Sequence, residues 1–441
     1  MSTEEKPGEG IYFLSLTLEN VRCFGEKQTL DLSDGNGKPA RWTVMLGDNG
    51  TGKTTLLQAI LRSYLAVDYF LDEDEKKIQK ASSPREVFSL RRNGSHSMSI
   101  EAEFAHGFSF SRGTENLEVS RIEQEFDDFM ALESWDDKQL NNKAHATAIF
   151  GYDANRTLKS DKTSLEIENI HYNNAFSDKS DLINAEEWLL QTDYVAKIPS
   201  QIQEQYQERF KIIIEVLVNL LPGVKAIGIS VPTEKHPNPK VGFETDNGWL
   251  NLSQLSLGYQ TMTAWMVDLA ARMFAAYPNS PNPIAEPAVV LIDEIDLHLH
   301  PKWQRTIMSY LSERFVNTQF IVTAHSPLIV QAAEQANIVV LRREGDHVVI
   351  EQQKHAVQGW RIDQLLTSDL FDLDSARSPH YEKKLAYRRQ LLSKPKLTAE
   401  DRAQLKALEA EIGYLPTAET AEDIAAMDII RRAAALLKTS A

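Results

Sequence analysis

The sequence predicts an α/β protein with an N-terminal antiparallel β lobe, a core built on a mostly parallel sheet, and a C-terminal helical appendage. Three observations favour this class. A buried-type strand at 41–46 runs straight into a Gly-rich loop and then into a helical pattern over 54–66. Apolar strands alternate with helices from 288 to 342, which is typical of a parallel sheet. Beyond residue 350 the pattern becomes helical.

The first half of the chain begins with an extended hairpin. Apolar and polar residues alternate over 11–19, and a second extended piece follows at 28–32. Residues 67–145 are acidic and polar, so we expect an irregular insertion with a few antiparallel strands. The further elements expected here are a strand at 98–104, helices at 185–193 and 201–221, and short strands at 226–231 and 240–245.

The second half carries the clearest strand and helix patterns. The continuous apolar run at 288–292 suits a central strand covered on both faces. Thr398 and Asp401 have capping-box spacing ahead of an amphipathic segment. The other expected elements are helices at 259–277, 303–314, 327–336 and 421–438, and strands at 319–323 and 337–342.

We divide the chain into four parts on these patterns. The parts are residues 1–66 with the Gly-rich loop, 67–249 with the insertion, 250–345 with the second lobe, and 346–441 as a helical region for docking a partner. The last part holds 14 Lys and Arg against 15 Asp and Glu, whereas the whole chain has a formal charge of −16. The excess of acid therefore lies upstream of the docking region.

Composition excludes several functional classes. No window of about 18 uncharged apolar residues occurs and no basic-then-apolar leader begins the chain, so we expect a cytoplasmic protein without a membrane span. Cys23 is the only cysteine, which excludes an internal disulfide and a cysteine zinc cage. The charge of −16 disfavours non-specific binding to nucleic acid.

The Gly-rich loop is the strongest functional motif. Its sequence, GDNGTGKT at 47–54, matches the phosphate-binding pattern G-x-x-x-x-G-K-[ST] between a strand and a helix. Its backbone amides are expected to hold the phosphates of ATP, with Lys53 on the β and γ phosphates and Thr54 on Mg²⁺. The loop residues predicted to bind the nucleotide are Gly47, Asp48, Asn49, Gly50, Thr51, Gly52, Lys53, Thr54 and Thr55.

Two further motifs follow strand ends in the second lobe. The strand at 288–292 delivers Asp293 and Glu294 to the edge where open α/β sheets bind ligands. Asp293 is predicted to act on Mg²⁺, and Glu294 to orient and polarise the attacking water. His325, at the exit of the next strand, is predicted to contact the γ phosphate or that water.

The signature segment, Leu255–Gln260, stands at the start of a predicted helix. Ser256 is expected to cap this helix, and the amides around Gly258 offer a second anion site. Alone, the segment would be a capped helix start. Its position between the Gly-rich loop and the Asp293–Glu294 pair favours a role in nucleotide binding.

In order, GDNGTGKT, LSLGYQ, LIDEIDLHLHP and VTAHSP resemble the motifs of ABC and SMC-like ATPases, in the short branch that includes RecF and the OLD-type enzymes. The resemblance covers about 11–342. It implies that Arg22 lies near the nucleotide, that Asp296 belongs to a loop acting across a dimer, and that Ser256 and Gly258 contact the γ phosphate of the other protomer. The usual glutamine loop has its equivalent at 150–156, and no heptads for a coiled-coil arm occur.

Short segments at 186–190 and 359–371 further resemble stand-alone ATPases of Septu and retron anti-phage systems, which work beside a separate HNH nuclease. The leading interpretation is an ATPase that dimerises around ATP and controls such an effector. Two alternatives stay open. One is a RecF-like DNA-repair ATPase, which needs a basic face. The other is a non-catalytic, ATP-bound scaffold that stores a toxin or nuclease, as in PARIS-type systems.

Overall fold

The computed structural model describes residues 9–71, 90–95, 97–111, 118–126, 131–135, 147–154, 176, 182–234, 237–352, 357, 359–392 and 398–412. The chain divides into two compact units, Met1–Leu365 and Leu366–Ala441. No helix among these described ranges is long and apolar enough to cross a membrane.

A six-stranded sheet forms the centre of the first unit. Its strand order is β14-β13-β3-β12-β11-β7, and all neighbours except the edge strand β14 run parallel. The strands are β3 (Trp42–Gly47), β7 (Ala148–Tyr152), β11 (Ala288–Ile292), β12 (Thr318–Thr323), β13 (Asn337–Glu344) and β14 (His347–Gln352). The predicted mostly parallel core is confirmed. β14, which falls in the segment expected to be helical, closes the sheet by a hairpin with β13.

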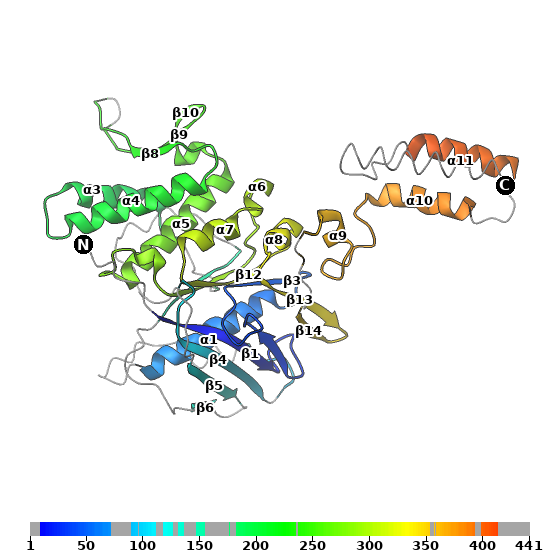
Figure 1. Ribbon diagram of the computed structural model, residues 1–441, viewed down its shortest axis with the longest axis horizontal. Helices are drawn as coiled ribbons and strands as arrows, with labels where there is room; N and C mark the ends of the chain where they lie inside the picture. The colour runs from blue at the N-terminus through cyan, green and yellow to red at the C-terminus, as the bar shows by residue number, and fades with distance from the viewer. Residues whose placement is uncertain are drawn as a thin grey trace. The chain divides into compact units, whose positions relative to one another are not determined.

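An antiparallel sheet lies on one side of this centre (Figure 1). Its order is β2-β1-β4-β5-β6. The strands are β1 (Gly10–Glu19), β2 (Gln28–Asp31), β4 (Met98–Phe108), β5 (Glu118–Phe126) and β6 (Ala131–Trp135). β1 and β2 pair as the predicted hairpin. Helix α1 (Lys53–Leu71) packs against strands of both sheets, so the main core joins the two sheets through this helix.

Helices cover the other side of the parallel sheet (Figure 1). They are α3 (Ala185–Lys197), α4 (Gln203–Leu220), α5 (Leu257–Ala276) and α7 (Ile307–Arg314). α5 contacts β7 and is covered by α3 and α4, so every residue from Thr261 to Phe274 is buried. A small antiparallel sheet precedes α5 and consists of β8 (Ala226–Ile229), β9 (Val241–Thr245) and β10 (Gly248–Asn251).

The helix predicted at 303–314 is divided in two. α6 (Pro301–Gln304) ends at a turn, and α7 begins after Thr306. The Thr306 amide and hydroxyl both donate to the Trp303 carbonyl. Because such local hydrogen bonds compete with helical ones, they end the first helix. The remaining short elements are η1 (Leu252–Gln254), η2 (Pro283–Ala285), α8 (Pro327–Ala332) and α9 (Ile362–Leu366).

The second unit contains the helices α10 (Pro379–Leu392) and α11 (Ala399–Ile412), which pack together. The predicted capping box at the start of α11 is confirmed. The Asp401 amide donates to Thr398 Oγ1 at 3.1 Å, and the Thr398 amide donates to Asp401 Oδ2 at 3.0 Å. The helix expected at 421–438 lies outside the described residues.

Candidate nucleotide-binding site

The Gly-rich loop turns tightly between β3 and α1. Gly47, Gly50 and Gly52 have φ angles of 145°, 78° and 87°, a region that side chains disfavour. A Cβ on Gly47 would lie 2.7 Å from the Leu341 carbonyl oxygen, and a Cβ on Gly52 would collide with the Cys23 thiol. The backbone therefore closes over the start of α1, where helix amides lack helical partners and favour an anion.

Lys53 is held inside this loop. Its side chain is buried, and Nζ donates to the carbonyl oxygens of Gly47 at 2.8 Å and Asp48 at 2.9 Å. Burial lowers its pKa, although the carboxylates of Asp293 and Glu294 oppose that effect. A charged ammonium group thus sits in a partly desolvated position, where a phosphate would be a strong counter-ion.

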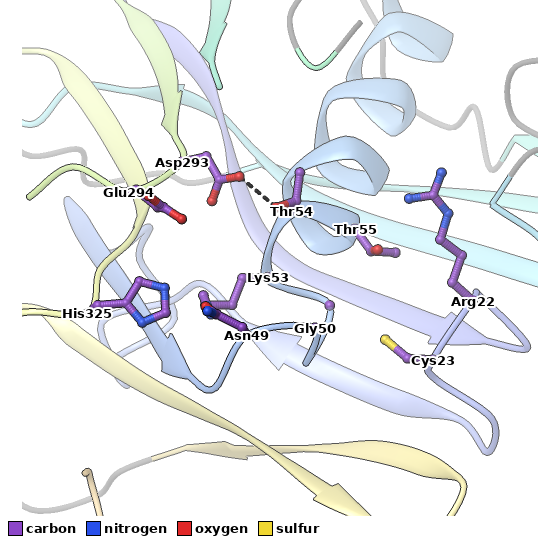
Figure 2. Close-up of a pocket in the computed structure, with 11 residues that line it drawn as sticks. Arg22, Cys23, Asn49, Gly50, Lys53, Thr54, Thr55, Asp293, Glu294 and His325 are labelled. Atoms are coloured by element: carbon purple, nitrogen blue, oxygen red, sulfur yellow. Dashed lines mark hydrogen bonds between the residues drawn. The ribbon is translucent and has the colours of Figure 1, made fainter. Parts of the chain in front are cut away.

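Asp293 joins the loop to the end of β11. Its Oδ2 accepts a 2.6 Å hydrogen bond from Thr54 Oγ1 (Figure 2). Its Oδ1 accepts a 2.5 Å hydrogen bond from Thr323 Oγ1. A hydroxyl and a carboxylate oxygen are ligands that Mg²⁺ prefers, and Mg²⁺ completes its shell with waters and substrate phosphates. The Thr54–Asp293 pair therefore fits a magnesium ion.

Glu294 follows in a left-handed backbone conformation, with φ of 51°. Its amide donates to Thr323 Oγ1 at 2.7 Å, so the same hydroxyl fixes both Asp293 and Glu294. The strained backbone turns Glu294 into the pocket (Figure 2). Thr323 is buried at the end of β12 and was not singled out from the sequence.

His325 lies on the rim of the same pocket. His325 is exposed, and its backbone amide donates to both carboxylate oxygens of Asp296, at 3.3 and 3.2 Å. Asp296 therefore holds the backbone of the loop that carries His325. In Figure 2 the His325 ring is on the same side of the pocket as Glu294.

The cavity formed by these elements has a volume of about 360 Å³. Its lining residues are Arg22, Cys23, Asn49, Gly50, Gly52, Lys53, Thr54, Thr55, Asp293, Glu294 and His325. All but Cys23 were candidate site residues from sequence. The lining does not include Gly47, Asp48 or Thr51; the Asp48 carbonyl accepts from Lys53 and from the Thr51 hydroxyl, so these residues shape the loop.

Arg22 enters the pocket from the turn after β1. Its φ is 45°, its amide donates to the Leu90 carbonyl at 2.7 Å, and Nη1 donates to Gln58 Oε1 at 3.0 Å. The guanidinium is thereby fixed beside α1. Cys23 follows it against Gly52, and burial raises the pKa of its thiol. A lone cysteine in a turn gives no sequence signal for a place in a nucleotide pocket.

The structure does not bring Ser256 and Gly258 into this pocket. Both lie at the start of α5, where Ser256 is exposed and holds the N-cap position. The expected side-chain cap is wrong, because the Ser256 hydroxyl makes no capping hydrogen bond. Gly258 approaches the loop after β11, since a Cβ there would lie 2.6 Å from the His298 carbonyl oxygen.

The predicted glutamine-loop equivalent lies at the end of β7. Tyr152 closes that strand, and its carbonyl accepts a 2.8 Å hydrogen bond from the Asp293 amide. Asn155 and Arg156, the last residues of the equivalent segment, lie outside the described residues. This part of the chain thus reaches the site through the backbone of Tyr152.

A strand, a glycine-rich loop and a helix, with two carboxylates at the end of a neighbouring parallel strand, define a P-loop ATPase of the ABC/SMC-like class. A family model described as "AAA domain, putative AbiEii toxin, Type IV TA system" matches residues 42–331. The chain belongs to this family.

The curated relatives include Septu proteins and retron ATPases. The chain is 25% identical over 378 residues to the Septu protein PtuA of Bacillus mycoides, a match covering 84% of this chain and 47% of that protein. It is 27% identical over 363 residues to the "Retron Vc95 probable ATPase" of Vibrio cholerae, covering 68% of each. The chain therefore spans about half the length of the Septu relative, and the resemblance to Septu and retron ATPases is confirmed.

Solved structures of SMC head domains also resemble the chain. An SMC head bound to the C-winged helix domain of ScpA has a TM-score of 0.44 and 17% identity, covering 78% of this chain and 97% of that chain. The SMC head domain from Thermotoga maritima has a TM-score of 0.41 and 17% identity, covering 78% and 100%.

Proposed function

We propose that the chain binds ATP with Mg²⁺ and hydrolyses it. The observation that carries this proposal is the meeting of Lys53, Thr54 and the Asp293–Glu294 pair around one cavity. Lys53 would exchange its two carbonyl partners for the β and γ phosphates. A magnesium ion on Thr54 and Asp293 would neutralise charge on the same phosphates.

Glu294 is the residue proposed to act on the attacking water. Its backbone is fixed by Thr323, and its carboxylate faces the pocket from the strand end opposite the loop (Figure 2). A carboxylate there orients the water and takes its proton as the water attacks the γ phosphorus. His325, from the neighbouring strand exit, would donate to the γ phosphate or hold the water.

The proposed active unit is a head-to-tail dimer. The start of α5 is exposed and outside the pocket of its own chain, with Leu257 56% exposed. An exposed helix start close to a second chain offers amides to a γ phosphate. Ser256 and Gly258 of one protomer would then close over ATP held by the partner.

We further propose that this ATPase controls a separate effector, an HNH nuclease, in phage defence. Its similarity to Septu and retron proteins supports the defence setting. The second unit, Leu366–Ala441, is compact by itself and contains none of the described pocket residues. It is therefore the proposed docking element for the effector.

Two measurements test these proposals. Purified chain should release phosphate from ATP in a Mg²⁺-dependent way, and lack of release by parental protein under saturating ATP would refute hydrolysis and leave a scaffold role. The tagged chain, expressed with its genomic neighbours, should copurify a nuclease. Recovery of DNA without a protein partner would instead favour a RecF-like role.

A truncation separates docking from catalysis. The cut belongs after Leu365, because β14 pairs with β13 in the central sheet and must stay. The shortened chain should bind ATP with parental affinity and lose the copurified effector. Retention of the effector by the shortened chain would contradict the docking role of the second unit.

A further inference from the structure

Tyr152 joins the nucleotide pocket to the helix that begins at the signature segment. Its backbone carbonyl, at the end of β7, accepts the 2.8 Å hydrogen bond from the Asp293 amide. Its hydroxyl donates a 3.0 Å hydrogen bond to Asp268 Oδ2 on α5. The Tyr152 ring also packs edge-on against Trp265, with ring centroids 5.9 Å apart. A single buried residue therefore contacts both the end of β11 and the middle of α5.

Asp268 is the centre of a buried hydrogen-bond cluster. Its side chain has no exposed surface. Oδ2 accepts from Arg272 Nε at 2.7 Å as well as from Tyr152, while Oδ1 accepts from the Ile183 amide at 3.0 Å and from Arg272 Nη2 at 3.3 Å. Both carboxylate oxygens are thus held by two donors each, so the carboxylate has one orientation.

The charge states fix the direction of these bonds. Burial, and then the negative charge of Asp268, raise the pKa of Tyr152 well above its usual value, so its hydroxyl stays protonated and donates. Burial alone would lower the pKa of Arg272, but Asp268 and Tyr152 outweigh burial and raise it. The cluster therefore holds a guanidinium, a carboxylate and a neutral phenol.

Stability alone gives little reason for an ion pair at this position. Desolvation of a buried pair offsets much of its attraction, and apolar residues of similar volume often stabilise a core equally well. Between Ala264 and Phe274, Asp268 and Arg272 are the only charged residues of α5, and both are buried. What the pair adds is a directional contact between this helix and the last residue of β7.

The position of the cluster along α5 connects the start of this helix to β7. Asp268 is ten residues from Gly258, which corresponds to about 15 Å along a helix axis. α5 is buried from Thr261 to Phe274, so a shift of its exposed start moves Asp268 with it. Through Tyr152, that shift reaches the backbone of Asp293.

We propose that Tyr152, Asp268 and Arg272 form a positioning link that couples the placement of the signature helix to that of Asp293 and Glu294. None of the three lines the pocket, so they act through Asp293 and not on the substrate. The inference rests on the proposed function, because it requires ATP to be bound and turned over at this site.

The test compares Tyr152, at one end of β7, with Tyr277, which contacts the other end of that strand. Tyr152→Phe removes only the hydroxyl at the pocket end of β7 and leaves Asp268 paired with Arg272. Tyr277→Phe is the matched control, since the hydroxyl of the half-buried Tyr277 donates to the Pro287 carbonyl and accepts from the Ala148 amide at the far end of β7. Each change removes one phenol hydroxyl that bonds across the contact between β7 and α5 or its C-cap residue.

For each variant, kcat, KM, ATP affinity and melting temperature are measured, with hydrogen exchange of α5 before and after ATP binding. Tyr152→Phe should lower kcat by about tenfold, the value of one hydrogen bond to a charged group, while ATP affinity stays within about twofold. ATP should change exchange along α5 in the parental chain and the control, and fail to do so in Tyr152→Phe.

The outcomes separate two failures. If both variants lose kcat equally, or neither does, or if exchange of α5 responds to ATP equally in all three chains, the positioning link is wrong although ATP turnover stands. If the parental chain neither binds nor hydrolyses ATP, the proposed function itself fails, and the link falls with it. Equal melting temperatures for the two variants ensure that a difference in kcat is not a loss of folded protein.

Discussion

The Thr54 hydroxyl donates a 2.6 Å hydrogen bond to the Asp293 carboxylate, and this contact joins residues 239 positions apart in the chain. Thr54 belongs to the first turn of α1, and Asp293 follows β11 directly. Thr54 and Asp293 would hold a Mg²⁺ ion, which would neutralise charge on the phosphates.

Lys53→Ala should remove most ATP affinity, because the phosphates lose a buried cation. Charged hydrogen bonds of this kind are worth about 1.5–3 kcal/mol, which corresponds to a loss of roughly 10- to 100-fold in affinity. Calorimetric titration with ATP measures the change. Lys38→Ala, on an exposed turn, is the control and should bind as the parent does. Parental affinity in Lys53→Ala would contradict the assignment.

Glu294→Gln should keep ATP bound and slow its hydrolysis by about 100-fold or more, because the amide preserves shape and cannot take a proton. Single-turnover phosphate release measures the chemical step. Glu344→Gln, at the exposed end of β13, is the control. Hydrolysis at the parental rate in Glu294→Gln would mean that another residue activates the water.

Thr323→Val should leave both Asp293 and Glu294 less firmly positioned, because it removes the acceptor of the Glu294 amide and the donor to the Asp293 carboxylate. A buried polar group left without a partner costs about 1–3 kcal/mol. The Mg²⁺ dependence of ATP binding should therefore be reduced in Thr323→Val. Thr323→Ser keeps the hydroxyl and should keep the parental Mg²⁺ dependence. If Val and Ser variants had the same Mg²⁺ dependence and melting temperature, the hydroxyl would have no role in the site.

Mixed dimers should recover activity that neither variant has alone. Ser256→Arg would block closure at the partner's site, and Lys53→Ala would prevent ATP binding at the site of its own chain. A heterodimer of the two has one intact composite site and one doubly altered site, so ATP turnover should rise on mixing. No recovery over a range of mixing ratios, or full activity of a strictly monomeric parent, would eliminate the shared site.

ATP affinity should fall at alkaline pH through Lys53. Burial lowers its pKa below the usual 10.5, so the folded chain loses this charge at a pH where an unfolded lysine still keeps it. Affinity should therefore decrease as pH rises through the lowered pKa, by up to about tenfold per pH unit. Between the folded and unfolded pKa values the unfolded chain binds more protons, so this group makes stability rise with pH.

The control for this pH effect is Lys53→Arg, whose guanidinium stays charged over the same range. Titrations between about pH 8 and 11 compare the two chains. The arginine variant should show a nearly flat affinity profile, whatever its absolute affinity. Equal slopes in the two profiles would assign the pH dependence to a group other than Lys53.

Most of the pocket could be predicted from sequence because its residues belong to contiguous motifs. The Gly-rich loop and the pair after β11 each carry their chemistry within a few positions, and parallel strands bring their carboxyl ends to one edge. The strand at 288–292 was predicted with its observed bounds, since a run of five apolar residues between polar flanks leaves little ambiguity.

Some contacts of the site depend on strand order. Thr323, which sequence reasoning missed, fixes Glu294 only because β12 lies beside β11. Tyr152 belongs to the predicted glutamine-loop equivalent, and it reaches Asp293 only because β7 lies on the other side of β11. No local pattern gives that order. β14 was likewise missed, because a hairpin after Gly345 lies in a segment whose downstream residues have a helical pattern.

The position of β3 in the central sheet has a consequence for synthesis on the ribosome. Its two neighbours are β12 and β13, and Trp42 pairs with Phe320, about 280 residues later in the chain. At about 5–20 residues per second, the strand that leads into the Gly-rich loop waits roughly 15 to 55 s for these neighbours. The hairpin of β1 and β2 needs no such delay. A nascent chain that stops before β12 therefore cannot assemble the nucleotide pocket, and the hydrophobic strand β3 stays without its sheet neighbours until β12 and β13 have been made.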